Sequence, residues 1–217
     1  MKLGFITSIL ENLSLEQVVE TAASIGYECI EAACWPHEKA SRRYAGVTHI
    51  DIESLDGNRI QSIRDLCSRH GVEISALAYY PNTLTDDLEK REQAVTHLQK
   101  MIQAAPRLGV GTVTTFIGRI QTKTVEENLA VFQEVWTPLI RMAEECGVKI
   151  AIENCPMLFG PDQWPGGQNL MTTPAIWRRA FELIPSSCFG LNYDPSHFIW
   201  QGIDYIRPLY EFRDKIF

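Results

Sequence analysis

Short apolar runs and longer, more polar segments alternate along the whole chain. Runs of this kind are typical of strands buried on both faces of a sheet, and the longer segments are typical of helices. The pattern predicts six strands, over residues 2–7, 27–33, 72–78, 110–116, 148–153 and 187–192. It predicts helices over residues 14–25, 54–70, 86–108, 124–146 and 172–183, and a further helical stretch within residues 203–212.

Capping residues mark where the expected helices begin and end. Ser14 with Gln17 forms the capping-box pattern that opens a helix. Four helices end at a glycine that stands directly before a strand, namely Gly26, Gly71, Gly109 and Gly147. A repeated order of helix, glycine and strand is the return of a βα unit, and it predicts a parallel sheet with right-handed crossovers.

The countable units indicate the fold class. Six βα units predict an α/β fold of the (β/α)8 TIM-barrel type, and the last residues, 214–217, look like the start of a seventh strand. A complete barrel typically needs about 250 residues. We therefore expect one domain over residues 1–217 that is incomplete at its C-terminus, either an open barrel or part of a longer one. An incomplete barrel exposes a strand edge, which favours a homo-oligomer or poor solubility.

Composition and charge narrow the possible partners. Of the 217 residues, 45% are hydrophobic and 22% are charged, an ordinary globular balance, and the net charge is −7. This charge disfavours binding to a nucleic-acid backbone. The first residues are too short for a signal sequence and no segment approaches a membrane span, so we expect no membrane association. The six cysteines form no C-x-x-C pair, which is typical of a reduced, cytoplasmic protein.

Two apolar runs each lead into a carboxylate. KIAIENCP (149–156) contains Glu153, and FGLNYDPSH (189–197) contains Asp194 and His197. Each has a structural alternative when taken alone, a salt bridge for Glu153 and a helix cap for Asp194. Together they are expected at one edge of the sheet, where carboxylates and an imidazole suit Mn²⁺, Mg²⁺, Co²⁺ or Zn²⁺. Glu153 is thus the candidate catalytic residue, with Glu153 and Asp194 as candidate metal ligands.

Further candidates follow other strands. His197, one turn beyond Asp194, can reach the same centre directly or through a substrate. The expected substrate-binding residues are His197, Asn154, Tyr80 and Trp164. Aromatic rings pack well on the C–H faces of a sugar, although rim or core packing is the alternative for each ring. The other histidines are expected at the surface, in loops or on helices: His37, His49, His70 and His97.

The chain resembles the xylose isomerase-like superfamily of sugar phosphate isomerases and epimerases. The motifs that carry the resemblance are LGFIT near the start, IAIEN with Glu153, and GLNYDPSH with Asp194 and His197. The resemblance extends over essentially the whole chain. It implies that Glu153 binds a metal and, in epimerases, also transfers a proton. It further implies that Asp194 binds the metal and that His197 contacts the substrate or the metal.

The sequence also departs from that superfamily. A His on the seventh strand and a Glu on the eighth complete the usual ligand set, and both would lie beyond Phe217. Phe159 stands where ketose epimerases often have a second Glu. The expected function is a divalent-metal-dependent isomerase or epimerase of a small sugar or sugar derivative. The alternatives are a polyol-ketone dehydratase of the same superfamily and a catalytically incomplete barrel fragment; the charge disfavours an abasic-site endonuclease.

Overall fold

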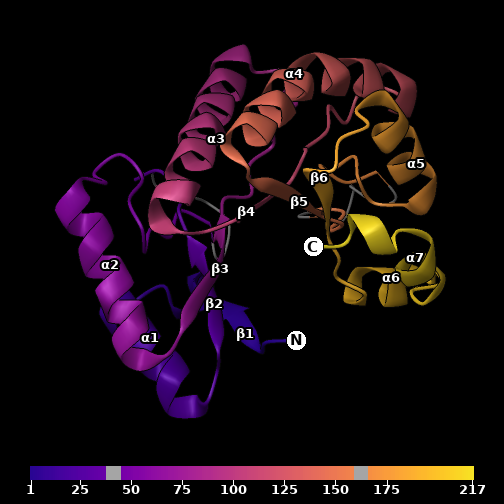
Figure 1. Cartoon of the computed structure of the whole chain (residues 1–217). Coiled ribbons are helices and arrows are strands. Elements are labelled where there is room, and N and C mark those ends of the chain that lie inside the picture. Colours follow the sequence, from indigo (N-terminus) through magenta and orange to yellow (C-terminus); the bar gives the residue numbers. More distant parts are fainter. Residues whose placement is uncertain (38–44, 159–165) are drawn as a thin grey trace. The chain divides into compact units, whose positions relative to one another are not determined.

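Six strands form one open sheet, in which the strand order follows the order of the sequence (Figure 1). The structure is a computed structural model and describes residues 1–37, 45–158 and 166–217. The strands are β1 (Gly4–Ile6), β2 (Cys29–Ala33), β3 (Glu73–Ala78), β4 (Thr112–Thr115), β5 (Lys149–Glu153) and β6 (Phe189–Asn192). The pairs β1–β2, β2–β3 and β5–β6 are parallel. The predicted α/β fold, a partial TIM barrel with six βα units, is confirmed.

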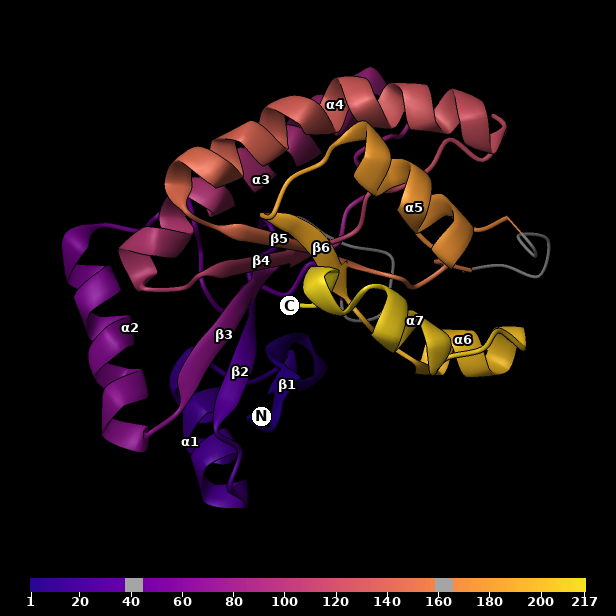
Figure 2. The ribbon, with the colours of Figure 1, turned by 45° about the vertical axis from the view of Figure 1, so that its right-hand side comes forward.

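Helices connect the strands. They are α1 (Leu15–Ile25), α2 (Gly57–His70), α3 (Leu88–Leu108), α4 (Val125–Cys146), α5 (Pro174–Leu183), α6 (Ser196–Gln201) and α7 (Arg207–Glu211), with short 3-10 turns η1 (Thr7–Leu10) and η2 (Arg213–Lys215). Figure 2 shows α4 and α5 running beside each other over β5 and β6. The helical stretch predicted within residues 203–212 is the short helix α7. The helix α6, which contains His197, begins four residues after the end of β6.

Local signals explain most of the boundaries. The capping box of Ser14 and Gln17 is present, and Gly26, Gly71 and Gly147 end their helices in the left-handed conformation. The second helix begins at Gly57 rather than at residue 54, because the Asp56 side chain accepts a hydrogen bond from the backbone N–H of Arg59. The observed strands are shorter than the predicted ones, since the apolar pattern extends beyond the paired residues.

The contacts divide the chain into two compact units. The first comprises residues 1–79 and 100–113, and the second comprises residues 80–99 and 114–217. Every residue of the candidate site lies in the second unit. The expectation of one domain over residues 1–217 stays a prediction.

An aromatic cluster around Trp177 forms part of the core of the second unit. The Trp177 ring is fully buried, stacks on Phe198 of α6 at 5.3 Å, and meets Tyr193 and Phe212 edge-on. Its Nε1–H donates a hydrogen bond of 2.8 Å to the carbonyl of Met171. The cluster therefore packs on both sides of the segment 194–197 and fixes it against α5.

The outer edge of β6 is partly covered by the last residues of the chain. Ile216 forms a parallel bridge with Leu191, and the N–H of Phe217 donates to the carbonyl of Leu191 at 3.1 Å. A Cβ atom on Gly190 would collide with the carbonyl of Lys215 and the ring of Phe217. The expected start of a seventh strand is thus a 3-10 turn followed by a single bridge, and it requires glycine at position 190.

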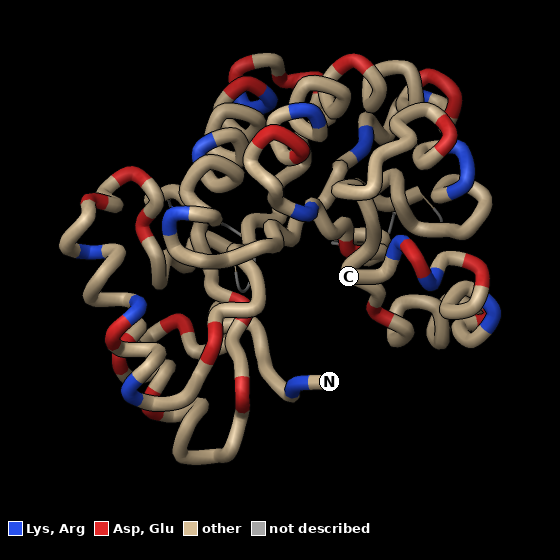
Figure 3. Tube along the Cα trace, viewed as in Figure 1, with Lys and Arg blue, Asp and Glu red and all other residues tan. Residues whose placement is uncertain are grey.

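Charged residues of both signs are interspersed along the helices (Figure 3). Arg178 and Arg179 of α5, an adjacent basic pair, are each neutralised by a carboxylate, Glu211 and Glu126 respectively. Within the described ranges, no helix combines the length and the apolar character that a membrane crossing requires.

Two histidines expected at the surface, His49 and His97, are buried. His49 Nε2 donates to the carbonyl of Leu13 at 3.0 Å, so Nδ1 accepts from the hydroxyl of Thr7 at 2.8 Å. The same hydroxyl oxygen accepts the N–H of Ala33 at 2.9 Å. Burial lowers the pKa of His49, against the effect of its backbone hydrogen bonds, so the folded chain keeps the ring neutral.

The contribution of His49 to the free energy of unfolding should fall as the pH is lowered through the ordinary histidine pKa of 6.5, whereas His197, whose pKa is raised to about 10, contributes in the opposite direction. Below pH 6.5 the unfolded chain binds a proton at His49, whereas the folded chain does not. This contribution to stability is therefore present above pH 6.5 and is lost below it. Urea unfolding between about pH 8 and pH 5 measures the effect. His49→Gln should flatten the slope, whereas His37→Gln, which removes a 70% exposed ring, should not. Equal slopes in the wild type and His49→Gln would contradict this prediction.

Candidate metal and substrate site

The site lies where two neighbouring parallel strands end. Glu153 is the last residue of β5 and is in register with Asn192, the last residue of β6. Asp194 follows two residues after β6, and His197 is the second residue of α6. The carboxyl ends of parallel strands are where α/β barrels carry their functional groups.

The structure brings Glu153, Asp194 and His197 together. His197 Nε2 lies 3.1 Å from Glu153 Oε1 and 3.4 Å from Asp194 Oδ2. The side chains of Glu153 and His197 are 20% and 17% exposed, whereas that of Asp194 is 40% exposed. The imidazole is therefore held between two carboxylates, one enclosed and one facing solvent.

The charge of His197 depends on these neighbours. Burial opposes protonation of the ring, but the Cys155 sulfur, the Glu153 carboxylate and the charge of Asp194 outweigh it and raise the pKa to about 10. Without a metal the ring is thus positively charged at neutral pH. Its Nδ1 atom is buried and, among the described residues, has no hydrogen-bond partner.

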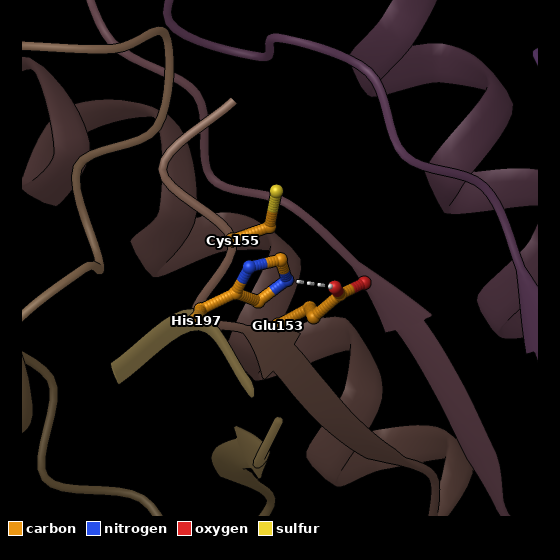
Figure 4. Close-up of side chains that lie close together, drawn as sticks. All are labelled: Glu153, Cys155 and His197. Carbon is orange, nitrogen blue, oxygen red and sulfur yellow. Dashed lines mark hydrogen bonds and ion pairs between the residues drawn. The ribbon is translucent and has the colours of Figure 1, made fainter. Parts of the chain in front are cut away.

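Cys155 is a member of the site that the sequence reasoning missed. Ligand atoms of Glu153, Cys155 and His197 all lie within 4.8 Å of one another, and Figure 4 shows the three side chains gathered together. The backbone N–H of Met157 donates to Cys155 Sγ at 3.4 Å. The spacing of Cys155 from Glu153 could have indicated it, because residues two positions apart in an extended chain point to the same face.

The remaining predicted site residues have different positions. Asn154 is fully buried, and its amide clamps the backbone of Asp194 by donating to the carbonyl at 2.9 Å and accepting from the N–H at 2.7 Å. The hydroxyl of Tyr80 accepts a hydrogen bond of 3.2 Å from Asn192. Trp164, like Phe159, lies outside the described residues. The substrate-binding roles of these residues stay predictions.

Asn169 is a second residue that the sequence reasoning missed. Its buried amide donates to the backbone carbonyls of Glu153 and Cys155, at 3.0 and 2.8 Å, and accepts from the N–H of Gly118 at 3.3 Å. It thereby fixes the chain on either side of the turn out of β5. A buried loop asparagine has no periodic pattern, so the sequence offered no signal for it.

The donor set fits a divalent metal ion. Glu153 supplies a carboxylate oxygen, His197 supplies an imidazole nitrogen, and Cys155 supplies a sulfur. The enclosed carboxylate and the unpartnered Nδ1 atom are polar groups that a bound ion would satisfy. Of the two residues that the sequence predicted as metal ligands, Glu153 belongs to this set, whereas Asp194 lies beside it, with Oδ2 3.4 Å from His197 Nε2. The metal-binding roles of both stay predictions.

The chain has a partial α/β barrel with carboxylates and an imidazole at the ends of its strands. This arrangement is typical of TIM-barrel proteins, whose functional residues lie at the carboxyl ends of the strands. The chain belongs to the xylose isomerase-like TIM barrel family, which matches residues 19–217. The resemblance predicted from the motifs around Glu153 and Asp194 is confirmed.

Individual relatives agree with this assignment. The uncharacterized protein YfiH of Bacillus subtilis (strain 168) is 24% identical, over 94% of this chain and 67% of its own length. The probable 3-DHS dehydratase AsbF of Bacillus anthracis shares the fold with a TM-score of 0.74 and 15% identity, over 100% of this chain and 71% of its own. The IOLI protein with a binding zinc atom has a TM-score of 0.71 and 24% identity, over 100% of this chain and 70% of its own. Several proteins of this fold are named as sugar epimerases.

Asn169→Ala should weaken binding of Zn²⁺ by about 10- to 100-fold, the usual effect of losing a group that orients metal ligands. The control is Asn128→Ala, because Asn128 is an equally buried asparagine that bonds loop backbone beside α4 instead. Both variants leave buried backbone groups unpaired and should lose about 1–3 kcal/mol of stability. Competition with a chromophoric chelator measures the affinity, and equal losses in both variants would contradict a positioning role for Asn169.

Proposed function

We propose that this chain is a divalent-metal-dependent isomerase or epimerase of a small sugar or sugar derivative. One observation carries the proposal: Glu153, enclosed at the end of β5, lies 3.1 Å from His197, which in turn lies 3.4 Å from Asp194. In this proposal Glu153 is an acid–base group that lies beside the metal ligands at one edge of the sheet. The family membership supports the proposal, since proteins of this fold are named as sugar epimerases.

The roles of the side chains follow from their chemistry. A divalent ion held by Glu153 and Asp194 would polarise the carbonyl of a bound sugar and acidify the adjacent C–H group. The Glu153 carboxylate accepts that proton and returns it to the neighbouring carbon, while the proton of the adjacent hydroxyl group moves to the former carbonyl oxygen; together these are the proton transfers of an isomerase. His197 orients the carboxylate through its hydrogen bond.

Other residues position these groups. Asn154 clamps the backbone of Asp194, so we assign it the support of the ligand as well as the predicted proximity to substrate. Asn192 donates a hydrogen bond to the hydroxyl of Tyr80, and we assign Tyr80 its predicted contact with the substrate. Trp164 completes the proposed sugar-binding residues, as an aromatic surface for the C–H face of the ring.

Solvent exchange tests the proposal without knowledge of the physiological substrate. The chain is incubated in heavy water with D-fructose or D-tagatose, ketoses named with proteins of this fold, and Mn²⁺, Co²⁺, Zn²⁺ or Mg²⁺. We expect deuterium to enter the carbon next to the carbonyl, as followed by NMR, and the exchange to stop when a chelator removes the metal. Loss of water from the sugar would support the dehydratase alternative, and binding without exchange would support a non-catalytic protein.

A further inference from the structure

We propose that Cys155 binds the divalent ion as a thiolate, which makes the site a mixed carboxylate, thiolate and imidazole site that prefers Zn²⁺ or Co²⁺ to Mg²⁺ or Mn²⁺. The inference shares one assumption with the proposed function, namely that a divalent ion binds at this edge of the sheet. It does not require turnover, and it adds a ligand that neither the motifs nor the sequence resemblance indicated.

The position of the sulfur is the first reason. Cys155 follows Glu153 by two residues, and the ligand atoms of Glu153, Cys155 and His197 lie within 4.8 Å of one another. Two ligands of one Zn²⁺ ion are at most about 4.6 Å apart, twice the Zn–S distance. The three side chains come from β5, the turn after it and α6, and they lie close together (Figure 4). Small side-chain rotations therefore suffice to enclose an ion.

The turn after β5 is built around this sulfur. The N–H of Met157 donates to Sγ at 3.4 Å, so the sulfur accepts a backbone hydrogen bond from its own turn. Met157 itself has a φ of 55°, a left-handed conformation that is uncommon for a residue other than glycine. The carbonyl of Cys155 is held by Asn169, and a Cβ atom on Gly167 would collide with the carbonyl of Pro156. The backbone is thus fixed in the conformation that aims the N–H of Met157 at the sulfur.

The neighbouring nitrogen is also suited to an ion. The buried Nδ1 atom of His197 has no hydrogen-bond partner among the described residues, while Nε2 is bonded to Glu153. When the ion binds, the Cys155 thiol and the imidazole each release a proton to solvent, and the metal–sulfur and metal–nitrogen bonds replace the bonds to hydrogen. A thiolate with an imidazole suits Zn²⁺ and Co²⁺, whereas Mg²⁺ and Mn²⁺ favour oxygen ligands.

Titration with Co²⁺ or Cd²⁺ tests the proposal, because a thiolate ligand gives a ligand-to-metal charge-transfer band in the ultraviolet. We expect the band in the chelator-treated full chain, and we expect Cys155→Ser to abolish it and to weaken Zn²⁺ binding by at least about tenfold. The matched control is Cys67→Ser, since Cys67 is a partly buried free cysteine of α2 in the other unit. Circular dichroism and a thermal melt of each variant establish that it is folded.

The outcomes separate this inference from the proposed function. Metal binding that Glu153→Gln weakens, but that produces no charge-transfer band, would overturn the role of Cys155 and leave the proposed enzyme standing. A band that persists in Cys155→Ser would also overturn it. Solvent exchange that proceeds without any metal would contradict the metal-dependent function, whereas a band without exchange would support the thiolate site and contradict the function.

Discussion

Glu153→Gln should lower the rate of metal-dependent solvent exchange by about 10²- to 10⁴-fold, the usual contribution of a positioned acid–base group. Glutamine keeps the shape of the side chain and can still accept the hydrogen bond from His197, but it cannot take up a proton at neutral pH. It also removes the negative charge from the metal-ligand set. The free energy of unfolding of the metal-free chain should fall by about 1.5–3 kcal/mol, because Glu153 accepts a hydrogen bond from the charged His197 ring. NMR of the exchange and urea unfolding together measure both effects.

The control for this variant is Glu126→Gln. Glu126 is a glutamate on α4 that binds Arg179 and is 67% exposed, so its loss should leave exchange unchanged. A wild-type exchange rate in Glu153→Gln would show that Glu153 does not transfer the proton. Equal losses in both variants would instead indicate a general electrostatic effect and would contradict a specific role.

Trp177→Ala should lower the free energy of unfolding by about 3–5 kcal/mol, the range for deleting a large buried ring. The fully buried indole stacks on Phe198 and contacts Tyr193 and Phe212, and its Nε1–H satisfies the carbonyl of Met171. Removing it leaves a cavity and an unpaired carbonyl. Because the same cluster holds the segment 194–197, the affinity for Zn²⁺ should fall as well.

Tyr210→Ala is the matched control, since it removes an aromatic ring of α7 that is 78% exposed. This variant should change the free energy of unfolding by no more than about 0.5 kcal/mol. Urea unfolding measures both variants under the same conditions. A small loss in Trp177→Ala would mean that the cluster can repack, and an unchanged Zn²⁺ affinity in that variant would separate the cluster from the metal ligands.

The elements of the fold could be predicted because their signals are local. The capping side chain of Ser14 and the glycines before the strands act within a few residues, so the sequence carries them directly. Strand lengths were overestimated because apolar residues continue past the paired region. The short helix α6 was not predicted, since six residues are too few to show a helical period.

The site was predictable only in part, for a related reason. Glu153 and Asp194 stand out because each carboxylate follows an apolar run. Cys155 does not, since a single cysteine with no C-x-x-C partner is usually taken as a small apolar residue. The contacts of Asn169 and His49 join segments far apart in the chain, so their burial depends on tertiary packing that no local pattern encodes.

The bridge between Leu191 and Ile216 has a consequence for how the chain is synthesised. The two residues are 25 positions apart, so at about 5–20 residues per second the ribosome needs about 1–5 s to make the segment between them. Until the last residues are added, the outer edge of β6 lacks the bridge to Ile216, although the other edge can pair with β5, and an open edge of this kind can pair with another chain. The missing side chain at Gly190 then lets Lys215 and Phe217 close over this edge. Protection of the growing chain from aggregation thus depends on the smallest residue in the strand.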